Sequence, residues 1–128
     1  MIVVGFTPKP QGRTALTAAI AEARLRDCGL LVVNASKGDS LVDPTLASDD
    51  QLAEARAELT SSGVPFELHQ DLSGGGAEVL VTAAEEHSAV LLVIGIRKRS
   101  PTGKLLFGSD AQRILLDAPC PVLAVKAG

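Results

Sequence analysis

Aromatic residues are scarce in this 128-residue chain, which has three Phe and neither Trp nor Tyr. Proteins that bind single-stranded nucleic acids stack the bases on aromatic side chains, and this composition does not favour such a surface. A formal net charge of −3 also disfavours a general DNA or RNA binder, although it leaves room for one local basic site. We therefore expect no nucleic-acid partner.

Long apolar runs are missing as well. No run approaches the roughly 18 residues that would indicate a helix crossing a membrane. The first residues, "MIVVGFTPKP", lack the basic segment and the long apolar segment of a signal peptide. These absences predict no membrane contact and a cytoplasmic location.

Residues for metal or nucleophilic chemistry are also few. Cys28 and Cys120 form no CxxC pair and lie in or beside apolar segments, which is typical of small buried hydrophobic residues. His69 and His87 are the only histidines, and neither has a cysteine or carboxylate at metal-ligand spacing. No serine lies in a G-x-S-x-G elbow. We predict neither a metal site nor a catalytic residue.

The chain does contain short apolar runs that alternate with longer amphipathic stretches. The 46% hydrophobic fraction is ample for one core, so residues 1–128 are expected to form a single domain. The expected strands are 2–6, 30–35, 64–70, 89–95 and 121–126, and the expected helices are 13–29, 48–63, 77–88 and 109–118. Strict alternation predicts a five-stranded parallel sheet with helices on both faces, which is a doubly wound α/β, flavodoxin-like fold. The predicted strand order is 3-2-1-4-5.

Several residues predict where these elements begin and end. Ser48 is a candidate N-cap, and Gly63 and Gly29 are candidate helix terminators. Gly12 is expected in the turn before the first helix. The stretch "SGGGAE" (73–78) lacks the GK[ST] ending of a P-loop, so we interpret it as a flexible turn.

The carboxyl ends of the strands are where a doubly wound sheet binds ligands. The loops after 2–6, 30–35 and 89–95 are therefore the candidate site. Gly95 would let the backbone approach a ligand, and Gly108-Ser109 would open a helix whose N–H groups attract anions. Between these glycines lie four basic residues: Arg97, Lys98, Arg99 and Lys104. This segment is either a phosphate cradle or a solvated charged connection.

The end of the chain resembles the universal stress protein family. Gly95, Gly108 and Ser109 match the family pattern G-x2-G-x9-G-S/T, and "CPVLAVK" matches the Pro-Val strand that follows the last helix. The resemblance runs from "IVVGF" to this final strand. It implies a five-stranded parallel sheet and homodimers paired through the last strand. In the nucleotide-binding branch it implies ATP or AMP across the strand ends, with magnesium accompanying the nucleotide. Because the sequence supplies no convincing nucleophile with its base, any ATP hydrolysis would be slow.

Two positions depart from the pattern. Lys98 occupies the second glycine position, and a lysine does not readily adopt a positive φ. Thr7 occupies a position where nucleotide-binding members carry an aspartate, and a hydroxyl cannot replace both carboxylate acceptors. The resemblance implies that Thr7 and Asn34 flank the nucleoside while Gly95, Gly108 and Ser109 line the phosphates. Either ATP binding is lost or weak, or Arg97 and Lys98 hold a phosphate through their side chains.

The last predicted strand would lie at a sheet edge, where free backbone groups invite pairing with a second copy. The predicted interface residues are Val122, Leu123, Ala124 and Val125. Two functions follow from the sequence. The protein is either a stress-response regulator that binds an adenine nucleotide or another phosphorylated ligand, or a dimeric module whose basic loop contacts a protein partner.

Overall fold

The computed structural model describes residues 1–36, 45–96 and 109–127, and within them it confirms the predicted α/β fold. The elements are β1 (Ile2–Gly5), α1 (Pro10–Arg26), β2 (Leu30–Ala35), α2 (Asp49–Ser62), β3 (Phe66–Asp71), α3 (Gly76–Glu86), β4 (Leu91–Ile96), α4 (Ser109–Asp117) and β5 (Val122–Lys126). The five strands are parallel and lie in the predicted order β3-β2-β1-β4-β5.

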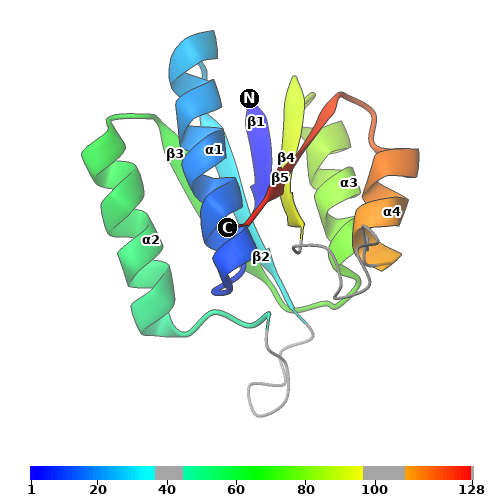
Figure 1. Cartoon of the computed structure of the whole chain (residues 1–128), viewed down its shortest axis with the longest axis horizontal. Coiled ribbons are helices and arrows are strands. Elements are labelled where there is room, and N and C mark those ends of the chain that lie inside the picture. Colours follow the sequence, from blue (N-terminus) through cyan, green and yellow to red (C-terminus); the bar gives the residue numbers. More distant parts are fainter. Residues whose placement is uncertain (37–44, 97–108, 128) are drawn as a thin grey trace.

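Two layers of helices enclose the sheet. Figure 1 shows α1 and α2 to one side of the strands and α3 and α4 to the other. Alternate residues of the central strands serve the two layers: Val4 packs toward α1 and α2, whereas Val3 packs toward α3 and α4. Because β1, β2 and β4 are covered on both faces, their side chains are almost all buried.

The first helix begins and ends earlier than expected. It starts at Pro10, because proline is well suited to the first helical position, so Gly12 lies inside the helix and not in a turn. It ends at Arg26, because Asp27 adopts a left-handed conformation with φ 52°. Aspartate tolerates this conformation through its short polar side chain, so Gly29 is not the terminator.

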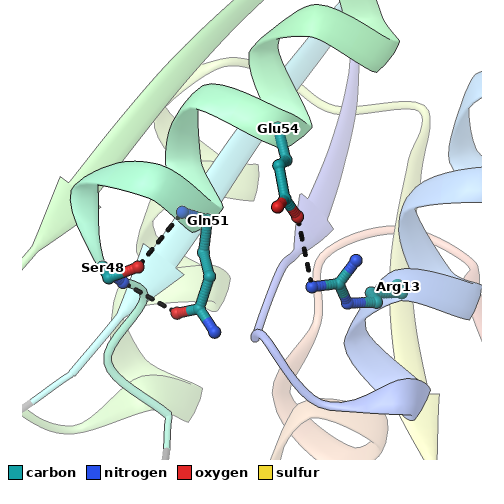
Figure 2. Close-up of polar contacts among 4 residues, drawn as sticks. All are labelled: Arg13, Ser48, Gln51 and Glu54. Atoms are coloured by element: carbon teal, nitrogen blue, oxygen red, sulfur yellow. Dashed lines mark hydrogen bonds and ion pairs between the residues drawn. The ribbon is translucent and has the colours of Figure 1, made fainter.

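The second helix follows its sequence signals. Ser48 accepts a hydrogen bond from the Gln51 N–H at 3.1 Å, and the Gln51 side chain accepts one from the Ser48 N–H at 2.8 Å. Figure 2 shows this capping box beside the Arg13–Glu54 ion pair, which joins α1 to α2. Gly63 ends the helix with φ 76°, as predicted. The capping box fixes the start of α2, and the ion pair links this helix to α1.

The third helix packs one apolar face against the sheet. Its buried residues are Ala77, Leu80 and Ala84, whereas Val79 and Ala83 lie at the margin of the core.

Within the residues that the structure describes, no helix is long and apolar enough to span a bilayer.

Candidate functional site

The carboxyl ends of β1, β2 and β4 bring three of the predicted site residues to one edge of the sheet. Thr7 follows β1, Asn34 lies near the end of β2, and Gly95 is the penultimate residue of β4. Ser109 is the first residue of α4. The predictions for Arg97, Lys98 and Gly108 fall outside the described residues.

Asn34 is completely buried and its amide is fully hydrogen-bonded within the chain. Its Nδ2 donates to the carbonyl oxygens of Phe6 at 2.9 Å and Thr45 at 2.8 Å. Its Oδ1 accepts from the Ala47 N–H at 3.1 Å and from Gln70 Nε2 at 2.9 Å. An asparagine amide offers two donors and two acceptor lone pairs, and all are used. Asn34 thus ties the segment after β1 to the segment before α2, and a nucleoside contact through this amide stays a prediction.

Gln70 completes this network and was not singled out from the sequence. Its Nε2 also donates to the Ala47 carbonyl at 2.9 Å, so an edge-strand residue helps to hold the entry to α2. A polar residue near the end of an edge strand gives no local sign of such a role, because its partners are far away in the chain. Only the parallel register, in which Asn34 lies opposite Gln70, brings the two amides together.

Thr7 differs from Asn34 in its hydrogen bonding. Its hydroxyl is buried and has no hydrogen-bond partner among the residues that the structure describes. It lies against the first turn of α1, where a side chain at Gly12 would overlap Thr7 backbone and hydroxyl atoms. The N-cap of α1, Lys9, makes no side-chain cap, and the first turn carries no acidic residue. The free N–H groups of a helix start and this hydroxyl therefore lie together at the end of β1.

At Gly95, the space that a side chain would fill is occupied by another part of the protein and not open to a ligand. A methyl group there would overlap the carbonyl of Gln11, in the first turn of α1. The glycine therefore lets α1 pack directly on β4 beside the candidate site. This close approach is a structural reason for glycine that the spacing of the family pattern does not reveal.

A separate open groove lies between β3 and α3, which we call the β3–α3 groove. It has a volume of about 480 Å³. Its lining residues are Leu31, Val33, His69, Asp71, Ser73, Gly74, Gly75, Glu78, Val79, Thr82, Ala83, Glu86 and His87. The predicted turn at "SGGG" forms one end, with Gly74 and Gly75 at positive φ. Within the described ranges, no group of three or more His, Cys, Asp or Glu side chains is arranged to hold a metal ion.

Two ionisable groups of the described residues have shifted pKa values. The side chain and backbone N–H of Ser73 donate to Asp71, and these hydrogen bonds hold the pKa of the Asp71 carboxyl below its usual range. The Asp71 carboxylate therefore stays charged at neutral pH. Partial burial raises the pKa of the Cys120 thiol, which makes this cysteine a poor nucleophile.

A doubly wound α/β domain with polar groups at the ends of its central strands belongs to the class of folds that place ligands at this edge. The sequence profile of the universal stress protein family matches residues 1–126. A universal stress protein of Mycolicibacterium smegmatis is 52% identical over 98% of this chain and 97% of its own. The chain belongs to the universal stress protein family.

Solved structures agree with this membership. The structure of a universal stress protein from Archaeoglobus fulgidus has a TM-score of 0.80 at 34% identity, covering 98% of this chain and 97% of its own. A universal stress protein from the same organism was solved in complex with dAMP. It has a TM-score of 0.72 at 26% identity and covers 98% of this chain and 96% of its own.

Proposed function

We propose that this protein is a stress-response regulator that binds an adenine nucleotide, ATP or AMP, at the carboxyl ends of β1, β2 and β4. The observation that carries the proposal is the Thr7 hydroxyl, which is buried beside the start of α1 without a partner among the described residues. A buried hydroxyl without a hydrogen bond is costly, and a bound ligand would satisfy it. The relative solved with dAMP supports the choice of ligand class.

The start of α1 supports an anionic ligand at the same place. A 17-residue helix begins at Pro10 with no side-chain cap and no acidic residue in its first turn. Its positive end therefore has no compensating negative charge from that turn. A phosphate or a ribose hydroxyl close to Thr7 would meet this end of the helix.

The remaining contacts are proposed from the family pattern. Gly108 and Ser109 would donate backbone N–H groups to the phosphates, with Gly95 at the opposite end of the segment, and Arg97 and Lys98 would contribute positive charge. Magnesium would accompany ATP through the phosphates. With no predicted nucleophile and base, ATP hydrolysis would be slow.

Calorimetric titration with ATP and with AMP tests the proposal. Thr7→Val removes the hydroxyl while keeping the shape of the side chain, and we expect at least about fivefold weaker binding because one buried hydrogen bond is lost. Thr7→Asp restores the carboxylate of the nucleotide-binding branch and should strengthen binding. Thr17→Val is the matched control, because Thr17 is exposed and donates to Arg13 within α1. Equal affinities for all four proteins would contradict a site at Thr7.

A second function is favoured by the contacts of Asn34 and Gly95. The Asn34 amide is fully bonded within the chain, and the space at Gly95 is taken by Gln11. These contacts are compatible with a dimeric interaction module that holds no nucleotide. Absence of heat with either nucleotide, for the wild type and for Thr7→Asp, would favour this alternative.

We also propose that the protein forms a homodimer through β5. Within the described chain, β5 pairs with β4 alone, so one edge of it faces outward. Val122, Leu123, Ala124 and Val125 are each half-buried in the single chain. Antiparallel pairing of two β5 strands would use this edge, and sedimentation velocity measures the resulting mass.

A further inference from the structure

The edge of the sheet opposite β5 is formed by β3, whose backbone offers a second free edge. Among the described residues, β3 pairs with β2 alone. The Pro65 and Asp71 carbonyls both accept hydrogen bonds from the β2 side, each at 2.9 Å. Because peptide groups alternate along a strand, the N–H and C=O groups of Phe66, Leu68 and Gln70 point away from β2. These outward groups can pair with an added strand.

The face of β3 toward α3 is not covered in the way that the central strands are. The helix α3 packs against β1, β2 and β4. Glu67 and His69 on this face of β3 are consequently exposed. The β3–α3 groove therefore runs directly beside the free edge, so side chains of an added strand would reach into it.

The lining of the groove combines an apolar floor with acidic walls. Leu31 and Val33 of β2 form part of the floor, and Asp71, Glu78 and Glu86 supply three carboxyl groups to the walls. Among these lining residues there is no Lys or Arg. One cation lies close by, because Arg113 pairs with Glu78 at 2.7 Å. The Asp71 carboxylate accepts hydrogen bonds from Ser73, and among the described residues neither it nor the Glu86 carboxylate forms an ion pair, so both are able to attract a basic partner.

We propose that β3 and the β3–α3 groove together bind an extended basic peptide segment of a partner protein. The peptide would add a sixth strand beside β3 through the outward groups of Leu68 and Gln70. Its Lys or Arg side chains would lay their methylene stems on the groove floor and bring their charged ends to Asp71 and Glu86.

Charge selects this occupant over a second copy of the chain. Two β3 strands paired edge to edge would bring the acidic residues Glu67 and Asp71 of one copy toward those of the other. Like charges on facing strands are destabilising, whereas opposite charges stabilise the pairing. The β3 edge thus favours a basic partner strand. The β5 edge is apolar and has no acidic residues that would favour one.

The test is fluorescence anisotropy of a short labelled peptide in which lysine and valine alternate, titrated with the full chain. Glu86→Lys reverses one charge in the groove. Glu58→Lys is the matched control, because Glu58 is exposed on α2, on the opposite face of the sheet from the groove, and gives the same net charge. We expect Glu86→Lys to weaken binding about tenfold and Glu58→Lys less than twofold, since a screened charge acts mainly within about 10 Å.

Backbone NMR locates the peptide independently of charge. The amide signals of Phe66, Leu68 and Gln70 should shift on binding, and a peptide of alternating glutamate and valine should not bind. Equal weakening by the two lysine variants would mean nonspecific attraction and would overturn the proposal. Shifts confined to Val122–Val125, self-association through β3 without peptide, or no binding by the wild type would overturn it as well.

Discussion

The carboxyl ends of β1 and β2 are neighbours in the sheet, yet their polar side chains are in opposite states. At the end of β2, the Asn34 amide makes four hydrogen bonds to Phe6, Thr45, Ala47 and Gln70. At the end of β1, the Thr7 hydroxyl is buried and lacks a partner within the described part of the chain. The amide at the end of β2 is thus fully hydrogen-bonded by the protein itself, whereas the hydroxyl at the end of β1 has no such bond to the described residues.

We interpret this difference as the difference between the scaffold and the proposed site. A buried polar group with all its partners fixes the backbone segments around it, since each broken bond would leave an unsatisfied group. A buried polar group without partners is costly, and contact with a bound ligand is one reason for a protein to keep such a group. Asn34 therefore acts as a positioning residue for the segment that carries Thr7, because its Nδ2 holds the Phe6 carbonyl immediately before Thr7.

The largest effect is expected where the scaffold is broken. Asn34→Leu keeps the size of the side chain but removes four hydrogen bonds from a completely buried position. The Phe6 carbonyl and Ala47 N–H lose these partners, so the free energy of unfolding should fall by about 3 kcal/mol or more. Urea denaturation followed by circular dichroism measures this change.

The control for this variant is Gln70→Leu, which leaves the Asn34 bonds to Phe6, Thr45 and Ala47 in place. It should cost about 1 kcal/mol, because Gln70 is exposed at the sheet edge and its bonds are partly replaced by water. Similar losses for the two variants would contradict the central role of Asn34.

A smaller loss is expected where α1 meets β4. Gly95→Ala places a methyl group into the Gln11 backbone, and the first turn of α1 must move to relieve the overlap. We expect a loss of about 2 kcal/mol in the free energy of unfolding. Gly5→Ala is the matched control, because its methyl group would lie 2.8 Å from the terminal Leu80 Cδ1, which can rotate away. Equal losses for the two alanines, measured by thermal or urea unfolding, would count against a rigid contact at Gly95.

The sequence predicted the order and type of every described element because apolar runs and amphipathic stretches alternate along the chain. Local signals also placed the start of α2 at Ser48 and its end at Gly63. The start of α1 was missed because proline is found in turns as well as in first helical turns. Its end was missed because Asp27 adopts the left-handed conformation in place of Gly29.

The candidate site was less predictable, because its residues are defined by contacts between distant segments. The contact that requires glycine at position 95 is with Gln11, and only the packing of α1 on β4 reveals it, while an approach of the Gly95 backbone to a ligand stays a prediction. The pairing of Asn34 with Gln70 depends on the register of β2 against β3. Neither contact leaves a pattern within one stretch of sequence.

The smallest effect on stability is expected at Thr7, and its sign distinguishes this residue from Asn34. Thr7→Val removes a buried hydroxyl that has no partner among the described residues, so the free energy of unfolding without ligand should stay the same or rise by about 0.5 kcal/mol. Thr17→Val, on the exposed face of α1, makes the same substitution away from the proposed site and so controls for the general effect of replacing threonine with valine. A loss of 1 kcal/mol or more for Thr7→Val alone, in urea denaturation without nucleotide, would mean that the hydroxyl already has a structural partner and is not reserved for a ligand.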